Sequence, residues 1–499
     1  MSTISIPPLG LSQVTRTALI GALALAAGFC VLYLAVGPGI EPIYPVTVAL
    51  LVPLGFFAMR KWPLIILAGL LFVGNFKTVP AEGIDLKDPT MIVLLLLMGA
   101  LLLDRLFVFP RVSPGTISAL FRGQLAVCAL FLLLCGVIVV SLFYTSSAMG
   151  AIKASRFATF EVIVFFAPIL LLKKKSDLRQ LLLAMVVLGA VLAVRVVIGL
   201  EHPSERVLRG DEDITKIGDS ELLGFALLVC LYGKPFESSA AKYASAVKYA
   251  FIVFFFFAVV ACAARTALLA LLVSLVASAC AARGGTGLLS RKAVIIGLVL
   301  AFAVTIPTYL WLRDLPAARE KVGWKMGELE ALASGSPIGT IGYRLGFYHS
   351  ALTALAQHPI LGLGVGGWSI YYYNEDVLHY PHDFVLEVGA EQGAVGLIIL
   401  MSLVAMLLRS ALKLLRWDPS LAFVFPVLVF CLSYQLTTGS VESRGLWFVC
   451  GLVAAASRLS TQARLGDHAQ ADVSKYKLAE ARTQRHTSVF LEDSRSHRR

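Results

Sequence analysis

Charged residues are scarce in this sequence. They make up 15% of the 499 residues, whereas 58% belong to the apolar set, and soluble domains usually carry about 25% charged residues. A water-soluble protein of this length could not hide so much apolar surface from water. The deficit of charge therefore excludes an ordinary soluble protein and makes lipid the solvent for most of the chain.

Cysteines at metal-ligand spacing are also missing. The eight cysteines all lie inside apolar runs, and none forms a C-x-x-C pair. They are interpreted as small apolar side chains, so no disulfide framework and no zinc site is expected. The acidic run Asp211-Glu212-Asp213 could be argued as a metal site, but a solvated loop is the preferred interpretation.

The net charge of +12 has a simpler explanation than nucleic-acid binding. Lys and Arg accumulate in the cytoplasmic loops of membrane proteins. If the N-terminus is cytoplasmic, every loop on that side is basic, as at Lys173-Lys174-Lys175, whereas the opposite loops are mostly poorer in basic residues or balanced by acids. We therefore predict that both termini are cytoplasmic and that nucleic acid is not a partner. The loops predicted to face outward lie near 145–156, 201–219, 313–384 and 438–444.

Long apolar runs alternate with these loops along the chain. About fourteen runs approach the roughly 20 apolar residues that a spanning helix needs. They lie near 17–36, 44–59, 62–75, 90–104, 125–144, 157–172, 180–200, 220–233, 247–264, 266–282, 293–312, 385–408, 420–437 and 445–457. The predicted fold is an all-α polytopic integral membrane protein with about 12–14 transmembrane helices. Residues 1–458 are predicted to form one transmembrane domain that includes the large outer loop 313–384, and 459–499 a disordered cytoplasmic tail.

The informative part of the large outer loop begins at Arg344. A helical pattern follows, and the His358-Pro359 pair is expected to end that helix. The residues of the apolar stripe are Leu345, Tyr348, Leu352 and Leu355.

Four glycines follow at positions 362, 364, 366 and 367. Glycine permits positive φ and lets the backbone approach a ligand closely. Because no strand precedes this run, a dinucleotide site is not indicated. A tight re-entrant turn and a ligand-contacting loop remain the two interpretations.

The segment Pro381-His382-Asp383 precedes a helix that is predicted to run into the membrane. Asp383 is a predicted N-cap, and Glu387 and Glu391 lie four residues apart on one face of the helix. Together with His382 they form a titratable cluster at the outer boundary of an apolar helix. Ionisable groups in such a place are costly and usually functional. For His382 alone, a hydrogen-bonded loop histidine is the alternative.

This segment resembles the C-terminal signature of the O-antigen ligase and O-antigen polymerase superfamily of bacterial membrane glycosyltransferases. The signature joins an upstream Arg, a Pro-x-x-Gly-x-Gly run, and a His followed by a polar residue, nine further residues and G-x-x-G. The matching residues are Arg344, Pro359, Gly362, Gly364, His382, Asp383, Gly393 and Gly396. The family more often has Asn at the position of Asp383, which makes the orientation of His382 a point to examine.

The resemblance implies a GT-C-like glycosyltransferase in the bacterial inner membrane, with its active site facing the periplasm. The implied donor is a glycan on undecaprenyl diphosphate, and the acceptor is either lipid A core or a second lipid-linked glycan. No cofactor is implied, and no metal is needed if arginines neutralise the diphosphate. The resemblance does not separate a ligase from a polymerase of O-antigen, capsule or exopolysaccharide.

Arginines at predicted outward helix ends suit a diphosphate, because the planar guanidinium makes bidentate contacts. Arg265, in CAARTALLA, resembles a small-residue-Arg motif of the family, and Arg209-Gly210 resembles an Arg-Gly element. Arg195 interrupts the apolar run VLAVRVVIGL. Snorkelling to phospholipid headgroups is the alternative for each arginine. Arg195 and Arg265 fit that alternative least, because apolar residues flank both.

These residues suggest a mechanism for the glycan transfer that the resemblance implies. His382 takes the proton of the acceptor hydroxyl as general base, Glu387 or Asp383 orients the imidazole, and the sugar is transferred with inversion. Arginines hold the diphosphate and neutralise the charge of the leaving group. The arginines with this predicted role are Arg344, Arg265, and Arg209 or Arg195.

A lipid-linked oligosaccharide flippase or a polysaccharide exporter is the competing class. Such transporters are expected to carry internal repeats and charged residues near the bilayer midplane. The sequence shows neither clearly, and its polar residues gather at one face. That distribution favours chemistry at the membrane surface over passage through the membrane.

Overall fold

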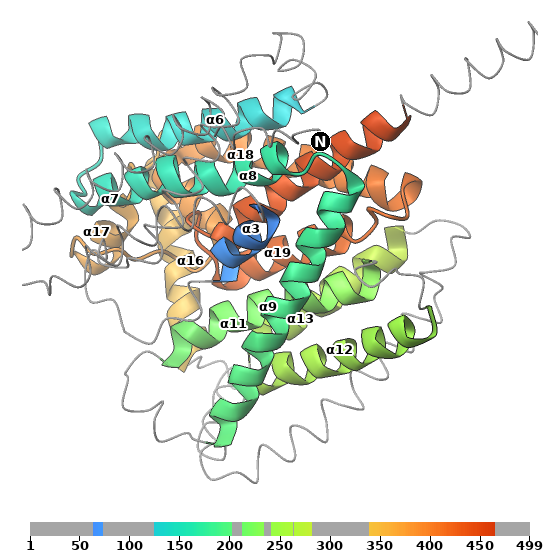
Figure 1. Ribbon diagram of the computed structural model, residues 1–499. Coiled ribbons are helices and arrows are strands. Elements are labelled where there is room, and N and C mark those ends of the chain that lie inside the picture. The colour runs from blue at the N-terminus through green and yellow to red at the C-terminus, as the bar shows by residue number, and fades with distance from the viewer. Residues whose placement is uncertain are drawn as a thin grey trace, which may run out of the picture.

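The computed structural model describes residues 63–72, 124–201, 212–233, 241–262, 264–281 and 339–464. Within these ranges the regular elements are all helices and no strand occurs, as Figure 1 shows. The all-α fold class is therefore confirmed. The predicted spans near 17–36, 44–59, 90–104 and 293–312 lie outside the described residues.

The described helices follow the predicted apolar runs closely. The first group comprises α3 (Pro63–Phe72), α6 (Leu125–Val140), the 3-10 turn η2 (Ser141–Phe143), α7 (Met149–Arg156), the π-helix η3 (Phe157–Glu161), α8 (Val162–Leu171) and α9 (Lys175–Glu201). The second comprises α11 (Glu212–Tyr232), α12 (Ala241–Ala261), α13 (Arg265–Ala281), α16 (Gly339–Gln357), α17 (Gly367–Tyr373), α18 (Phe384–Trp417) and α19 (Val424–Thr438). A last helical segment covers 444–464.

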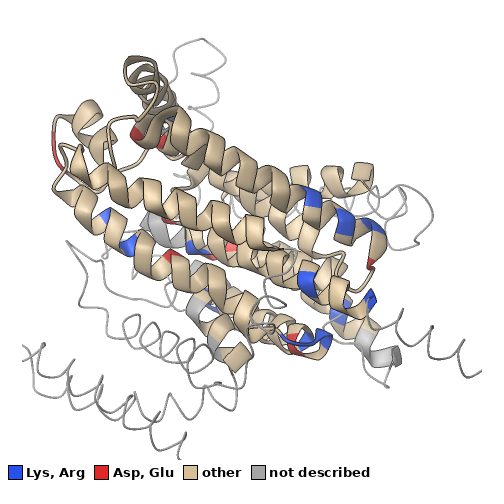
Figure 2. Ribbon diagram, turned by 90° about the horizontal axis from the view of Figure 1, so that it is seen from above, with Lys and Arg blue, Asp and Glu red and all other residues tan. Residues whose placement is uncertain are grey.

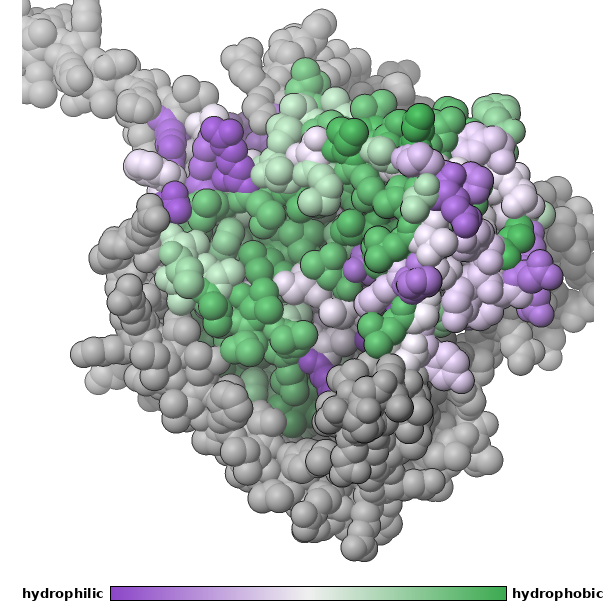
Figure 3. Space-filling model, turned by 180° about the vertical axis from the view of Figure 1, so that it is seen from behind, coloured by the Kyte–Doolittle hydropathy of each residue, from purple (hydrophilic) through white to green (hydrophobic). Residues whose placement is uncertain are grey.

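Several helices have the length and composition of membrane spans. Among the described residues, four are long and apolar enough: Leu125–Phe143, Met149–Leu171, Lys175–Val197 and Phe384–Trp417. α13, α19 and most of α12 are shorter apolar helices. The face in Figure 3 carries a broad hydrophobic region with hydrophilic residues gathered toward its sides. Large exposed apolar side chains on α6, α9 and α13 fit contact with lipid tails.

Neighbouring helices come from distant parts of the sequence. α6 packs along α18, α13 along α19, and α3 along α9. An aromatic cluster joins α6 to α8 and to the last helix, with Phe131 stacked on Phe165 at 4.0 Å and tilted against Trp447 at 5.0 Å. These contacts fix the helix ends relative to one another, which positions the loops described below.

One end of the bundle is basic. Lys175 at the start of α9 pairs with Asp418 after α18 at 2.9 Å, and the Arg458 guanidinium donates to the Leu172 carbonyl. These contacts bring together three segments that were assigned to the cytoplasm because of their Lys and Arg residues. In Figure 2, several ribbon segments of Lys and Arg residues lie together at one end of the helices.

The loops that were predicted to face outward also meet. The Ser147 hydroxyl donates to Asp376 at 2.6 Å, which joins the segment before α7 to the loop before α18. Val441 in the loop after α19 donates to Glu387 near the start of α18 at 2.7 Å. The two sets of loops predicted from charge thus occupy opposite ends of α18.

Two expectations about local structure were wrong. The predicted loop 145–156 is helical from Met149, and α7 continues through η3 into α8. α16 ends at Gln357 as predicted, but its buried face holds Phe347, Ala351 and Ala354, whereas Leu345 and Leu352 are exposed. The two alanines allow close packing of α16 on α18, and a pattern of large apolar residues does not reveal this.

Candidate active site

The glycine-rich loop after α16 fills a break in α18. Gly393 has φ 62° and ψ −156°, so the helical hydrogen-bond ladder is interrupted there. The loop supplies new donors to the carbonyl groups on the N-terminal side of the break. Leu363 N donates to Ala390 O at 2.9 Å, and Gly364 N donates to Glu391 O at 2.8 Å. The backbone of the loop thereby replaces one turn of helix.

On the C-terminal side of the break, the amides of α18 donate hydrogen bonds to carbonyl groups of the loop. Ala394 N donates to Pro359 O at 2.8 Å, and Val395 N donates to Ile360 O at 3.3 Å. A Cβ atom at Gly362, where φ is 71°, would collide with the backbone of α18. The predicted re-entrant turn is therefore present, and the Pro-x-x-Gly-x-Gly run and the G-x-x-G pair form a single structural unit.

The segment before α7 holds the other side of this loop. Val365 N donates to the Ser141 hydroxyl at 3.0 Å, and the Thr145 hydroxyl donates to Val365 O at 2.8 Å. The Tyr144 hydroxyl donates to Leu361 O at 2.8 Å. Side chains from η2 and from the two residues after it thus fix a loop more than 200 residues away in sequence.

Asp376 ties the following loop to the beginning of α7. Besides the Ser147 hydroxyl, its carboxylate accepts from Ala148 N at 2.8 Å and Met149 N at 3.2 Å. The Ser147 hydrogen bond is the main cause that lowers the pKa of Asp376, and the two amide bonds add to it. The carboxylate is therefore ionised at neutral pH and stabilises the helix N-terminus.

His382 lies just before α18 among aromatic rings. Its own backbone has φ 58°, an unusual conformation for a residue other than glycine. The imidazole lies 4.8 Å from the Tyr380 ring and 5.7 Å from the Phe347 ring, measured between centroids. The ring makes a hydrogen bond to the backbone of Thr438. Its buried Nδ1 has no geometric hydrogen-bond partner among the described residues.

This environment keeps the imidazole neutral. Burial is the largest cause that lowers the pKa of His382 to about 4, followed by the positive charge of Arg344 and by His379. The Thr438 hydrogen bond acts in the opposite direction. At neutral pH one ring nitrogen of the neutral imidazole has a lone pair that can accept a proton, which is the form that a general base requires.

Asp383 caps α18, as predicted. Its Oδ1 accepts from Val385 N at 2.8 Å and from Leu386 N at 2.9 Å. Burial raises the pKa of this carboxyl, and the two amide hydrogen bonds oppose that shift. Asn could make the same cap, so the departure from the family pattern at this position leaves the helix start unchanged.

Glu387 and Glu391 share one buried cation. The Lys153 ammonium lies 2.5 Å from Oε1 of Glu387 and 2.7 Å from Oε1 of Glu391, with all three side chains nearly or fully buried. Glu387 also accepts from the Ser440 hydroxyl at 3.1 Å and from Val441 N at 2.7 Å. Sequence reasoning placed Glu387 beside His382, whereas the structure places its carboxylate between α7 and the turn after α19.

Further charges surround this group. Glu442 is half-buried, and desolvation raises the pKa of its carboxyl to about 7, while Lys153 and Arg156 oppose the shift. Its Oε1 has no hydrogen-bond partner within the part of the chain that the structure describes. Sequence reasoning missed Lys153 and Glu442. The one available signal for Lys153 was its position between small and apolar residues, the same criterion that singled out Arg195.

The predicted arginines lie toward the His382 end of the bundle. Arg344, in α16, is half-buried, and its charge acts on His382 and Tyr380. α9 starts at the basic end and needs about 30 Å to reach Arg195, which is half-buried near the opposite end. Arg209 lies outside the described residues.

Arg265 is the first residue of α13 and is exposed. α13 runs antiparallel to α19, because Ser274 donates to Pro426 O at 2.6 Å while Cys262 lies near Tyr434. The start of α13 is therefore at the same end as Thr438. The structure thus gathers the histidine and three of the four predicted arginines toward one end, with Arg344 nearest to the imidazole.

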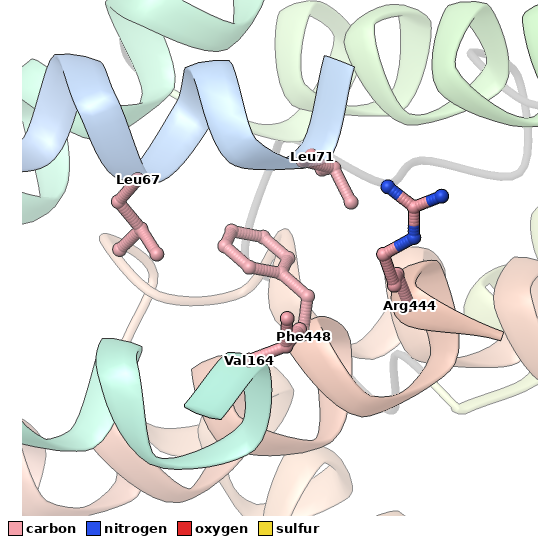
Figure 4. A pocket seen from close by; sticks show the side chains of 5 residues that line it. All are labelled: Leu67, Leu71, Val164, Arg444 and Phe448. Atoms are coloured by element: carbon pink, nitrogen blue, oxygen red, sulfur yellow. The ribbon is translucent and has the colours of Figure 1, made fainter. Parts of the chain in front are cut away.

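A small cavity lies elsewhere in the interior. It is a narrow gap between packed side chains and lies between α3, α8 and the last helix. Figure 4 shows Leu67, Leu71, Val164 and Phe448 around it, with the guanidinium of Arg444 on the Leu71 side. None of the predicted site residues lines this cavity. Among the described residues, no three His, Cys, Asp or Glu side chains converge as metal ligands.

The resemblance to a known family covers part of the chain. No curated protein matches the chain. The O-antigen ligase family model matches residues 250–401. The matched region runs from α12 into α18 and includes Arg265, Arg344, His382, Asp383 and Glu387, whereas Lys153 and the turn after α19 lie outside it. The match supports an enzyme of the glycosyltransferase type, and it confirms the resemblance of residues 250–401 to the O-antigen ligase and polymerase superfamily.

Proposed function

We propose that this protein transfers a glycan from an undecaprenyl diphosphate carrier to a lipid or glycan acceptor at the periplasmic face of the bacterial inner membrane. The observation that carries the proposal is the position of His382, whose buried Nδ1 has no hydrogen-bond partner among the described residues and whose ring is acted on by the charge of Arg344. A general base and a diphosphate-binding cation are the two groups that such a transfer needs.

The two ends of the bundle support this orientation of the protein in the membrane. The segments that contain Lys175 and Arg458 meet at one end, and the loops that surround His382 meet at the other. Basic loops remain in the cytoplasm. The His382 end would then face the periplasm, where a lipid-linked glycan is presented.

The chemical step is a substitution at the anomeric carbon of the donor sugar. A ring nitrogen of His382 accepts the proton of the acceptor hydroxyl, and the acceptor oxygen bonds to the anomeric carbon. The bond from that carbon to the phosphate oxygen breaks, its electron pair stays on the oxygen, and undecaprenyl diphosphate leaves. Attack from the face opposite the leaving group inverts the anomeric configuration.

Arginines stabilise the charge that develops on the leaving group. Arg344, whose charge acts on His382, would take this role, and Arg265 with Arg195 or Arg209 would complete the set. An anion bound at Arg344 would offset the charge that depresses the basicity of His382, so donor binding would strengthen the base. No metal is required for this scheme.

The proposal is tested with purified protein in detergent. The substrate is the lipid extract of a strain in which the gene is deleted, because that extract retains both the unused donor and the acceptor. Wild-type protein should release undecaprenyl diphosphate and form a new glycosidic bond. His382→Ala should lower the rate by about 100-fold or more, and Arg265→Ala should raise the donor concentration needed. Transfer by His382→Ala at the wild-type rate would refute the assignment of the base.

The same experiment separates the competing classes. A flippase or exporter makes no glycosidic bond, so an absence of product with an intact donor favours transport. The acceptor distinguishes the two enzyme types: a ligase modifies lipid A core, and a polymerase lengthens the lipid-linked glycan. The chain-length ladder of the polysaccharide in the deletion strain gives an independent answer.

A further inference from the structure

Lys153 and Glu387 form an ion pair in the interior of the helix bundle. Their side chains are 4% and 0% exposed, and Nζ lies 2.5 Å from Oε1. The cost of removing two charges from water offsets much of their attraction, so such a pair is a poor source of stability by itself. Its geometry indicates a different role, because Glu387 has further partners.

Glu387 connects α18 to the turn that follows α19. Its two carboxylate oxygens accept from the Ser440 hydroxyl and from Val441 N. Hydrogen bonds to an ionised acceptor are short and strong. Glu387 lies in the first turn of α18, five residues after His382, so the helix start and the turn are held together beside the imidazole.

The same turn carries the hydrogen-bond partner of His382. The His382 ring contacts the backbone of Thr438, the last residue of α19 and two positions before Ser440. This contact ties the orientation of the imidazole to the position of the turn. Movement of the turn by one ångström would release the imidazole from this orientation.

We propose that Lys153 and Glu387 position His382 through the turn 438–441, with Lys153 neutralising Glu387 and Glu387 holding the turn. This inference rests on the proposed function, in which His382 is the general base. Both residues are positioning residues, since neither touches the reacting atoms.

Glu391 provides a matched control in the same cluster. It has the same partner, with Lys153 Nζ 2.7 and 2.8 Å from its two oxygens, and it is equally buried. Its carboxylate has no contact with Ser440 or Val441 among the hydrogen bonds of the described residues. Removal of either carboxylate disturbs the charge of Lys153, but only removal of Glu387 releases the turn.

The experiment compares Glu387→Gln with Glu391→Gln in full-length protein purified in detergent. The lipid extract of the deletion strain supplies donor and acceptor, and the released undecaprenyl diphosphate is measured at varied amounts of extract. Thermal unfolding of each variant is followed in parallel. Ser440→Ala is a third variant, because it removes one Glu387 contact and leaves every charge in place.

We expect the two glutamate variants to lower the unfolding temperature by similar amounts. Glu387→Gln should also lower kcat by roughly 10- to 100-fold with little change in KM, because a small misplacement of a catalytic group is costly. Glu391→Gln should lose less than about threefold in kcat on the same argument. Ser440→Ala should lie between the two, and it remains informative if Glu387→Gln does not fold.

Equal losses of kcat in Glu387→Gln and Glu391→Gln, or full activity in Ser440→Ala, would overturn this inference and leave the proposed function in place. Wild-type protein that forms no glycosidic bond would overturn the proposed function and this inference with it.

Discussion

The amide of Gly364 donates a 2.8 Å hydrogen bond to the carbonyl oxygen of Glu391, at the point where α18 is broken. The carboxylate of the same Glu391 contacts Lys153. A single residue thus joins the glycine-rich loop to the buried ion pairs. The signature glycines matter for this docking, because they let the backbone of the loop reach the backbone of α18.

Substitution of Gly393 by Ala tests this docking. The residue has φ 62°, and a Cβ there would collide with the carbonyl of Ile360. We expect a loss of about 1–3 kcal/mol of stability or more, measured as a lower unfolding temperature in detergent. Gly136→Ala is the control, because a Cβ at that position in α6 meets nothing within 4 Å; it should be neutral or slightly stabilising.

Replacement of Lys153 by Met should destabilise the protein strongly. It leaves the buried carboxylates of Glu387 and Glu391 without their shared cation, and breaking a buried pair in this way costs about 3–5 kcal/mol. The exposed pair of Lys175 with Asp418 provides the comparison, and Lys175→Met should cost at most about 1 kcal/mol. Similar unfolding temperatures for the two variants would contradict the burial of Lys153.

Asp383 can be tested for two separate roles. If the carboxylate acts as the N-cap of α18, Asp383→Asn should retain stability and glycan transfer, whereas Asp383→Ala should cost about 0.5–2 kcal/mol. If its charge also orients the imidazole, Asp383→Asn should lower kcat while the unfolding temperature stays unchanged. The structure favours the first outcome, because Oδ1 is occupied by two amides.

Arg344 should set the pH range of activity. Burial first and the charge of Arg344 second lower the pKa of His382 to about 4, so the wild-type base stays neutral through the mildly acidic range. Arg344→Met removes one depressing charge, and the pKa of His382 should rise toward its ordinary value. The acid limb of kcat/KM, which reports the free enzyme, should then lie at higher pH than in the wild type, because the histidine of the variant becomes protonated earlier as the pH falls.

A charge-retaining substitution completes that test. Arg344→Lys keeps a cation beside His382, so its pH profile should stay close to that of the wild type even if donor binding weakens. A profile for Arg344→Met without any shift of the acid limb would show that the cation does not act on the base.

Labelling of engineered cysteines tests the orientation of the bundle. Tyr371 on α17 and Trp417 at the end of α18 are both exposed, at 37% and 68%, and lie at opposite ends. A membrane-impermeant maleimide should label Tyr371→Cys in intact spheroplasts and Trp417→Cys only after lysis. The reverse pattern would place His382 on the cytoplasmic side and end the proposal of transfer at the periplasmic face.

The sequence predicts the helices and their ends well. Apolar runs locate the spans, the His358-Pro359 pair stops α16, and Asp383 starts α18. These features depend on local chemistry, such as the missing amide of proline and the capping oxygen of aspartate. The division of the loops into two ends follows from the charge of residues that cannot cross the membrane.

The arrangement of the buried charges could not be predicted in the same way. Lys153 meets its glutamates across more than 230 residues, and its partner could not be chosen from sequence spacing. The predicted span 385–408 looked continuous, because a glycine in a helical pattern does not reveal its φ. The role of Glu387 was assigned from its distance in sequence to His382, whereas its carboxylate points to Ser440 and Val441.

The π-helix η3 sets the angular offset between the side chains of α7 and those of α8. A π turn contains one residue more than an α turn, and each helical residue advances the azimuth by about 100°. The face that carries Lys153 is therefore rotated relative to the face that continues along α8. Insertion of a single residue between the two segments is therefore enough to change which side chains face the centre of the bundle, which is a short evolutionary route to a new internal contact.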